Sequence, residues 1–228
     1  MKYFRYVCLI AGIAAAAIVP QTFAQTPALQ KGVSVQMAVT NNASPMPEAD
    51  KQDAWIVAVT APGEMYFGTE AVSAEQLSEE MKSHPRKRNA KLYIKADARA
   101  SYATVKKTLQ AAKEVMFDDA VLLTKQPEAP ALGMMVPPKG FDVSLTPASE
   151  AVVVQVSNSG QKVPEVKVNS SAVSAANLQA ALNQALQNRK QRLVIVKADP
   201  QLPFADVVHI IDAARSVGAE AVLPAAEM

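Results

Sequence analysis

Cysteine, histidine and an excess of either charge are all scarce in this sequence of 228 residues. A single cysteine excludes a disulfide scaffold and a cysteine-rich zinc site. The two histidines, His84 and His209, are too few and too far apart in sequence to build a histidine-based metal cluster. Lysine and arginine total 23 against 21 acidic residues. This near-balance argues against a dedicated nucleic-acid binder, which usually carries a strong basic excess.

The sequence motifs of the common enzyme classes are also missing. No G-x-G-x-x-G or Walker-type loop occurs, and no Ser-His-Asp set can be recognised. A hydrolase with paired carboxylates would need two acids that converge on one site, and no such pair is evident. Half of the residues are hydrophobic, so the chain can bury a sizeable core. We therefore expect a folded, non-enzymatic protein that needs no cofactor and no metal.

The first 24 residues have the pattern of a secretory signal peptide. Lys2 and Arg5 precede a wholly apolar run at 7–19, and Thr22 and Ala24 supply small residues before a cleavage site. The run has 13 residues, whereas a membrane-spanning helix needs about 20. We therefore expect cleavage and a periplasmic mature protein. An uncleaved anchor in the inner membrane, with the rest of the chain facing the periplasm, is the alternative.

The remainder of the sequence contains an internal repeat. Residues 72–77 match 173–178, and residues 92–97 match 194–199, at offsets of 101 and 102. The pairs 57–60 with 154–157 and 102–105 with 204–207 extend the match. Lys31-Gly32 and Lys139-Gly140 open the two copies. We expect a first domain at 31–125, a proline-rich linker at 126–138 and a second domain at 139–228.

Each copy is predicted to be a small α/β (α+β) unit with the element order ββαβαβ. Buried-type strands are expected at 55–60, 92–96 and 193–198, with Pro62-Gly63 as a turn. Ser73 and Gln76 form a capping box at the start of a helix. A further leading strand is expected near 33–39 and near 141–145. The strand–helix–strand connection should be right-handed, which places two helices on one face of a mixed sheet.

One ordered set of residues carries a family resemblance. In the second copy it comprises Val194-Ile-Val-Lys-Ala-Asp199, Pro203-Phe204, Asp212-Ala-Ala-Arg215 and Gly218. The first copy has the same frame, but Met116 stands where the family usually has glycine. The pattern resembles the periplasmic domain of the ExbD/TolR family of biopolymer transport proteins. The resemblance covers nearly all of 31–228, taken twice.

The resemblance implies a set of partners and one departure. Members of this family work with ExbB- or TolQ-like proteins, energise TonB- or TolA-like proteins, and contact those partners or peptidoglycan. Their coupling helix carries an intramembrane aspartate, yet residues 1–24 contain no acid. The chain therefore resembles the periplasmic module without the motor part. A membrane-anchored stator subunit and a periplasmic small-ligand sensor are the alternative functions.

The resemblance also selects candidate site residues, which are expected to be helix-end or partner-surface positions. They are Lys95, Asp97 and Tyr102 in the first copy, and Lys197, Asp199 and Phe204 in the second. The two acids fall between a strand end and a helix start, where a carboxylate can accept backbone N–H bonds or favour the helix dipole. The two aromatic residues are expected to anchor helices in the core.

Basic residues cluster in equivalent helix-to-strand loops of the two copies. They are Arg86-Lys87-Arg88 with Lys91, and Arg189-Lys190 with Arg192. A solvated corner is the simpler interpretation, and contact with anionic lipid, cell-wall carboxylates or an acidic partner is the alternative. Because a short linker holds the copies at high effective concentration, we also expect a monomeric pseudo-dimer in which the copies are related by an approximate two-fold axis.

Overall fold

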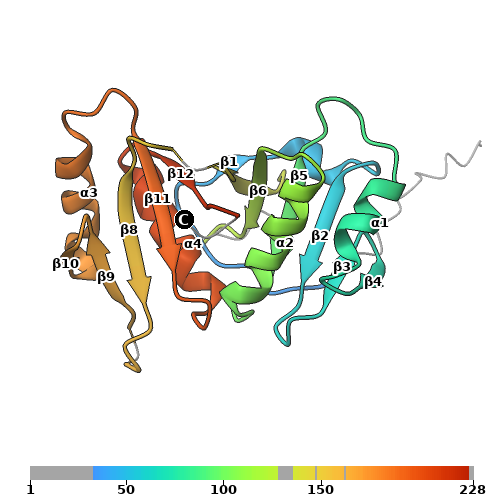
Figure 1. Cartoon of the computed structure of the whole chain (residues 1–228), viewed down its shortest axis with the longest axis horizontal. Coiled ribbons are helices and arrows are strands. Elements are labelled where there is room, and N and C mark those ends of the chain that lie inside the picture. The colour runs from blue at the N-terminus through green and yellow to red at the C-terminus, as the bar shows by residue number, and fades with distance from the viewer. Residues whose placement is uncertain (1–32, 128–135, 147, 162, 226–228) are drawn as a thin grey trace, which may run out of the picture. The chain divides into compact units, whose positions relative to one another are not determined.

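The computed structural model describes residues 33–127, 136–146, 148–161 and 163–225 (Figure 1). The described residues belong to one compact unit. The expected signal peptide at 1–24 lies outside the described residues, as does the middle of the expected linker. We call residues 31–125 copy one and residues 139–228 copy two.

Copy one begins with a short strand and a 3-10 helix and continues with the repeated elements. The first two are β1 (Ser44–Pro45) and η1 (Pro47–Asp50). The strands that follow are β2 (Trp55–Val59), β3 (Met65–Phe67), β4 (Glu70–Val72), β5 (Leu92–Ala96) and β6 (Asp119–Thr124). The helices are α1 (Leu77–Ser83) and α2 (Tyr102–Glu114).

Copy two has the same order of elements after a longer leading strand. Its strands are β7 (Lys139–Ser144), β8 (Val152–Ser157), β9 (Glu165–Val168), β10 (Ser171–Val173), β11 (Leu193–Ala198) and β12 (Glu220–Val222). Its helical segments are η2 (Ala175–Asn177), α3 (Leu178–Leu186) and α4 (Phe204–Ser216). The predicted α/β class is confirmed, because the described residues form one mixed sheet of 12 strands with four α-helices.

Two details differ from the elements that the sequence predicts. The edge strands β4 and β10 were not predicted, because three exposed or half-buried residues give no hydrophobic period. The leading strand near 141–145 is present as β7, whereas the one near 33–39 is reduced to a single bridge between Val39 and Lys125. The physical reason is competition, since β7 already occupies the edge of β6 along its whole length.

The strand order of the sheet is β10-β9-β8-β11-β12-β7-β6-β5-β2-β3-β4, with β1 also paired to β7. The parallel pairs β2–β5, β5–β6, β8–β11 and β11–β12 form the centre of each copy. The strands β6 and β7 join the copies in an antiparallel ladder from Asp119↔Ser144 to Thr124↔Lys139. The two copies therefore share one sheet.

One large hydrophobic core lies between the sheet and the helices. All four α-helices contribute buried residues to it, among them Leu77, Leu109, Leu182 and Ile211. A second, smaller cluster lies on the other side of the sheet, where Met46 and Ala49 of the η1 region cover Tyr93, Val121 and Leu123. Successive side chains of β5 and β6 point to opposite faces of the sheet. Because both faces are covered, these strands are apolar along nearly their whole length and contribute to both clusters.

Candidate functional site

The two Lys-Ala-Asp sequences occupy equivalent positions at the carboxyl ends of β5 and β11. The backbone N–H of Asp97 donates to the Val59 carbonyl at 2.8 Å, and that of Asp199 donates to the Val156 carbonyl at 2.8 Å. Each bond continues the parallel ladder by one residue beyond the strand. Both aspartates therefore start the loop that leads from the sheet into α2 or α4.

Asp97 is buried and fully engaged within the chain. Its carboxylate accepts from the backbone N–H of Gln36 at 3.0 Å and of Arg99 at 3.0 Å, and from the Arg99 guanidinium at 2.8 and 3.0 Å. The guanidinium holds the pKa of Asp97 well below its ordinary value of 3.8, although burial alone would raise that pKa. Asp97 thus remains ionised and fixes the loop.

Asp199 makes fewer contacts in copy two. Its carboxylate accepts the backbone N–H of Gln201 at 2.8 Å, which is the same two-residue turn that Asp97 makes with Arg99. Copy two has no arginine at this position, because Gln201 replaces Arg99. Asp199 is only half-buried, whereas Asp97 is buried.

The lysines of the motif also differ between the copies. Lys95 donates from Nζ to the Val33 carbonyl at 3.0 Å, and Ala98 donates its N–H to the Gln36 carbonyl at 2.8 Å. Copy one thereby holds its own leading segment against the end of β5. Lys197 is exposed, and Pro200 takes the place of Ala98, so copy two cannot hold a segment with the same bonds.

Tyr102 and Phe204 begin α2 and α4 and are both buried. Burial raises the pKa of the Tyr102 hydroxyl to about 12. The N–H of Tyr102 donates to the Leu202 carbonyl at 2.8 Å, and the N–H of Phe204 donates to the Ala100 carbonyl at 2.8 Å. Phe204 is equivalent to Tyr102, and Leu202 is equivalent to Ala100, at an offset of 102. Each helix start therefore donates to the same position of the other copy, which is the relation expected of a two-fold contact.

A second symmetric pair of bonds lies beside the first. Ala103 donates its N–H to the Pro200 carbonyl at 2.9 Å, and Ala205 donates its N–H to the Ala98 carbonyl at 2.9 Å. The first turns of the two helices therefore satisfy their free N–H groups with carbonyls of the other copy. These four bonds between the copies, rather than the carboxylates of Asp97 and Asp199, satisfy the first N–H groups of α2 and α4.

Two of the basic loop residues, Arg86 and Arg192, donate to carbonyls at the C-terminal ends of α2 and α4. Arg86 donates to the Val115 carbonyl at 2.8 Å, and its guanidinium lies 4.4 Å from the centre of the Phe117 ring. Arg192 donates to the Val217 carbonyl at 2.7 Å. Val115 and Val217 are the residues that follow α2 and α4. These arginines thus have a structural role, because a cation at a helix C-terminus binds the last free carbonyls.

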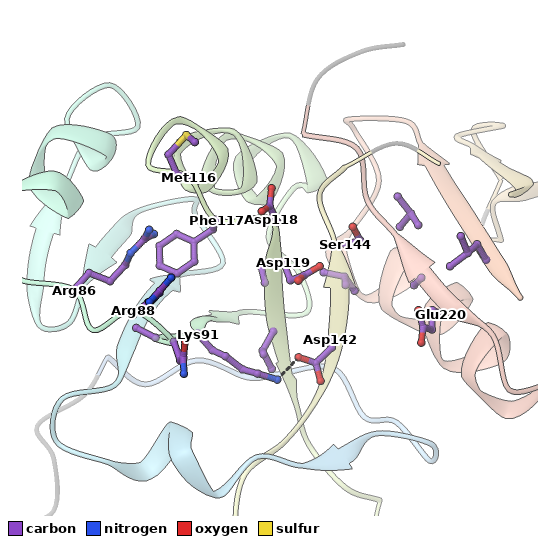
Figure 2. Close-up of a pocket in the computed structure, with 18 of the residues that line it drawn as sticks. Arg86, Arg88, Lys91, Met116, Phe117, Asp118, Asp119, Asp142, Ser144 and Glu220 are labelled. Carbon is purple, nitrogen blue, oxygen red and sulfur yellow. Dashed lines mark hydrogen bonds and ion pairs between the residues drawn. The ribbon is translucent and has the colours of Figure 1, made fainter. Parts of the chain in front are cut away.

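A polar cleft of about 560 Å³ lies where the two copies meet. Figure 2 shows Arg86 beside Phe117 at one wall and the ion pair between Lys91 and Asp142 at another. Basic and acidic side chains both line the cleft, including Arg88, Arg215, Asp119 and Glu220. No histidine is among the residues that line it. A lining with charges of both signs is suited to polar contacts with a partner or ligand.

The described residues hold no group of three or more side chains placed to bind a metal ion. His84 contacts the Phe67 ring edge-on, with 4.9 Å between ring centres, and its Nδ1 lies 2.9 Å from the Glu80 carbonyl. No helix in the described parts of the chain is long and apolar enough to cross a membrane. The features that remain open to a partner are the motif of copy two, the cleft and the two ends of the sheet.

Comparison with known proteins identifies the family. The model of the family described as biopolymer transport protein ExbD/TolR matches residues 18–128 and again residues 124–225. No curated protein and no solved structure matches the chain. The two matches together span most of the sequence and follow the two structural copies. The chain therefore belongs to the ExbD/TolR family of biopolymer transport proteins and contains two consecutive copies of its domain.

Proposed function

We propose that the chain is a periplasmic, non-catalytic binding component of a TonB- or Tol-type envelope transport system. Membership in the ExbD/TolR family makes it a component of a biopolymer transport system. The proposal goes further and assigns it contacts with ExbB/TolQ-like proteins, with TonB/TolA-like proteins or with peptidoglycan. We place the partner-binding domains at 31–125 and 139–228, joined by the segment 126–138.

One observation carries this proposal, namely that the shared sheet ends in the unpaired strands β4 and β10 among the described residues. An edge strand offers a row of free N–H and C=O groups, and an extended segment of a partner can pair with them. Strand addition needs no catalytic group, and it fits a cleft whose charges are of both signs. The absence of an acid in residues 1–24 supports a binding role without proton transfer.

Recovery of partners from intact envelopes tests the proposal. A tagged chain, cross-linked in the cell and purified, should carry ExbB/TolQ-like or TonB/TolA-like proteins or peptidoglycan fragments. The matched control is a chain with proline at both edges, at Ala71 and Ala172, which should lose those partners. If both chains recover the same partners in equal amounts, the edge strands β4 and β10 are not the binding sites.

The cleft of about 560 Å³ favours a second function, sensing of a small polar ligand. A thermal-shift screen separates the two, because a small ligand that binds the native state raises its melting temperature. The membrane-anchored alternative is tested by electrophoresis before and after export, since cleavage at Ala24 shortens the chain.

A further inference from the structure

The two ends of the shared sheet have the same fold but different surroundings. The strand β4 and helix α1 lie at one end, and β10 and helix α3 lie at the other (Figure 1). Within the described residues neither β4 nor β10 has a neighbour on its outer side. The repeat therefore supplies an internal comparison, in which one edge serves as the control for the other.

Turn geometry determines which backbone groups face outward. Gly68 and Thr69 join β3 to β4, and Phe67 pairs with Glu70 at the base of this two-residue turn. The closing pair of such a hairpin exchanges its hydrogen bonds, and the pairs along the ladder then alternate. Ala71 consequently directs its N–H and C=O away from β3. The same argument applies to Ala172, since Asn169 and Ser170 form the turn between β9 and β10.

The edges differ in charge. Copy one has glutamates at 70, 75, 79 and 80, and the matching positions of copy two hold Ser171, Ala176, Ala180 and Ala181, whereas Glu64 is matched by Glu165. Residues 61–83 contain five acids and one lysine, which gives −4, whereas residues 158–186 contain one acid and two lysines, which gives +1. Glu64, Glu70 and Glu75 are exposed beside β4.

Protection against aggregation does not account for these glutamates. Charged side chains are one means by which proteins keep edge strands from pairing with other chains. The strand β10, however, has the same length and the same exposure pattern as β4 and has no charged residue. The acids of copy one are therefore not a requirement of the edge itself.

A hollow of about 570 Å³ lies beside β4 and can receive a side chain of an added strand. Val72 and Met65 provide apolar contacts in it, while Glu75, Ser73 and Thr104 provide polar ones. Gly63 closes one side with φ of 92°, and a Cβ at this position would lie 3.2 Å from Thr104 Oγ1. A side chain at position 63 would therefore crowd Thr104 on this side of the hollow.

We propose that β4 is the docking edge of this molecule, and that it binds an extended, basic segment of a partner protein by strand addition. This inference rests on the proposed function and specifies the site and the partner's chemistry. The added strand pairs with the outward N–H and C=O of Ala71, and its lysine or arginine side chains face Glu64, Glu70 and Glu75. Such exposed charge pairs contribute mainly to specificity and association rate, so binding should weaken with salt.

The test uses two labelled nine-residue peptides, one alternating lysine with valine and the other alternating glutamate with valine. Fluorescence anisotropy with the intact protein measures binding of each peptide at low and at high salt. We expect the lysine peptide to bind at least about tenfold more tightly at low salt, and to lose that advantage at high salt. The substitution Ala71→Pro should abolish the binding, and Ala172→Pro should leave it unchanged.

A second variant keeps the test valid if Ala71→Pro impairs folding. The double substitution Glu70→Lys and Glu75→Lys changes exposed side chains only, and it should reverse the preference between the peptides. Binding that is lost with Ala172→Pro, or that ignores the charge reversal, overturns the inference. Equal binding of both peptides at β4 overturns the basic partner but leaves strand addition standing. Chain-to-chain pairing of β4 with β10, seen as a mass increase that either proline prevents, also overturns it.

Discussion

Met116 and Gly218 follow the equivalent helices α2 and α4 in the same left-handed conformation, with φ of 65° and 72°. A residue with a side chain is strained there by roughly 1–2 kcal/mol. Met116 is 78% exposed, so burial offsets little of this strain. Copy one therefore keeps a locally unfavourable residue where copy two has the residue that the turn prefers.

Replacement of Met116 by glycine should stabilise the protein. The left-handed strain is removed, glycine adds back some entropy to the unfolded chain, and the net gain should be roughly 0.5–1 kcal/mol. The matched change Gly218→Ala should cost about 1 kcal/mol. A Cβ at position 218 would have only Arg192 Nε nearby, at 4.0 Å, so backbone strain alone acts there. Urea unfolding measures both, and a less stable Met116→Gly variant would show that the methionine side chain has a stabilising contact.

Asp97 and Asp199 should differ in their effect on stability, although the motif is the same. Asp97→Ala leaves the backbone N–H groups of Gln36 and Arg99 without their acceptor and removes charge-assisted bonds, at a cost of roughly 1.5–3 kcal/mol. Asp199→Ala removes one bond to Gln201 and should cost roughly 0.5–1.5 kcal/mol. Thermal unfolding of the two variants provides the comparison. Equal losses would contradict the assignment of Asp97 as the more deeply embedded residue.

Asp97 should also make stability depend on pH. Its pKa in the folded protein lies below the ordinary value of 3.8, so the unfolded chain binds the proton first as the pH falls. The stabilisation by ionised Asp97 is therefore complete above about pH 5 and is lost progressively below about pH 4. Asp97→Asn should flatten this acid limb of the stability curve. Chemical unfolding at pH 3, 4, 5 and 7 measures the effect.

At the scale of elements, the strand pair β6–β7 determines how the copies are joined. Gly140 lies on β7 opposite Leu123. A Cβ at position 140 would lie 2.7 Å from the Leu122 carbonyl oxygen and 2.8 Å from a Val121 methyl carbon. The two backbones can approach this closely only because position 140 is glycine.

The substitution Gly140→Ala should destabilise the protein by about 1–3 kcal/mol, since the backbone of β6 must move to accept the methyl group. Gln155→Ala on β8, where the side chain is exposed, is the control and should change stability by less than about 0.5 kcal/mol. Denaturant titration of both variants is sufficient. An unchanged midpoint for Gly140→Ala would mean that β6 and β7 are not held as tightly as described.

The length and period of each element decided whether sequence could predict it. The central strands and the helices α2 and α4 have long apolar patterns and lie where the pattern indicates. The short helix α1 begins at Leu77 rather than at the predicted Ser73–Gln76 capping box, because Ser73 Oγ accepts the N–H of Gln76 in a turn that precedes the helix. The strands β4 and β10 have only three residues and no alternation, so only hairpin pairing with β3 and β9 defines them. The leading segment of copy one has strand-like sequence but lies elsewhere, because pairing of β6 with β7 excludes it.

At the scale of the whole molecule, the leading segment of copy one ties the copies together. After its bridge to Lys125, the backbone N–H groups of Asn41 and Asn42 donate to the Asp212 carboxylate of α4, at 3.2 and 2.8 Å. The strand β1 then pairs with β7. These contacts add to the symmetric bonds between the starts of α2 and α4, so the surfaces through which single copies could pair are used within one chain.

The protein should therefore be monomeric at low micromolar concentration. Internal pairing is favoured because the linker keeps the copies at high effective concentration. Light scattering of the exported chain should give the mass of one chain. A mass near two chains would show that copies pair between molecules. Dilution should leave the melting temperature unchanged, since a monomer has no concentration-dependent stability.

The repeat, the α/β class, the family and the residues of the Lys-Ala-Asp motif could all be predicted from the sequence, because local patterns and their order carry that information. The sharing of one sheet by the two copies, the contacts of Asp97 with Arg99 and Gln36, and the place of β4 and β10 as outer strands among the described residues became visible only in the folded molecule. The reason is that strand pairing and burial depend on residues far apart in the chain. Two equally strand-like segments competed for the edge of β6, and the contacts of the whole fold selected β7.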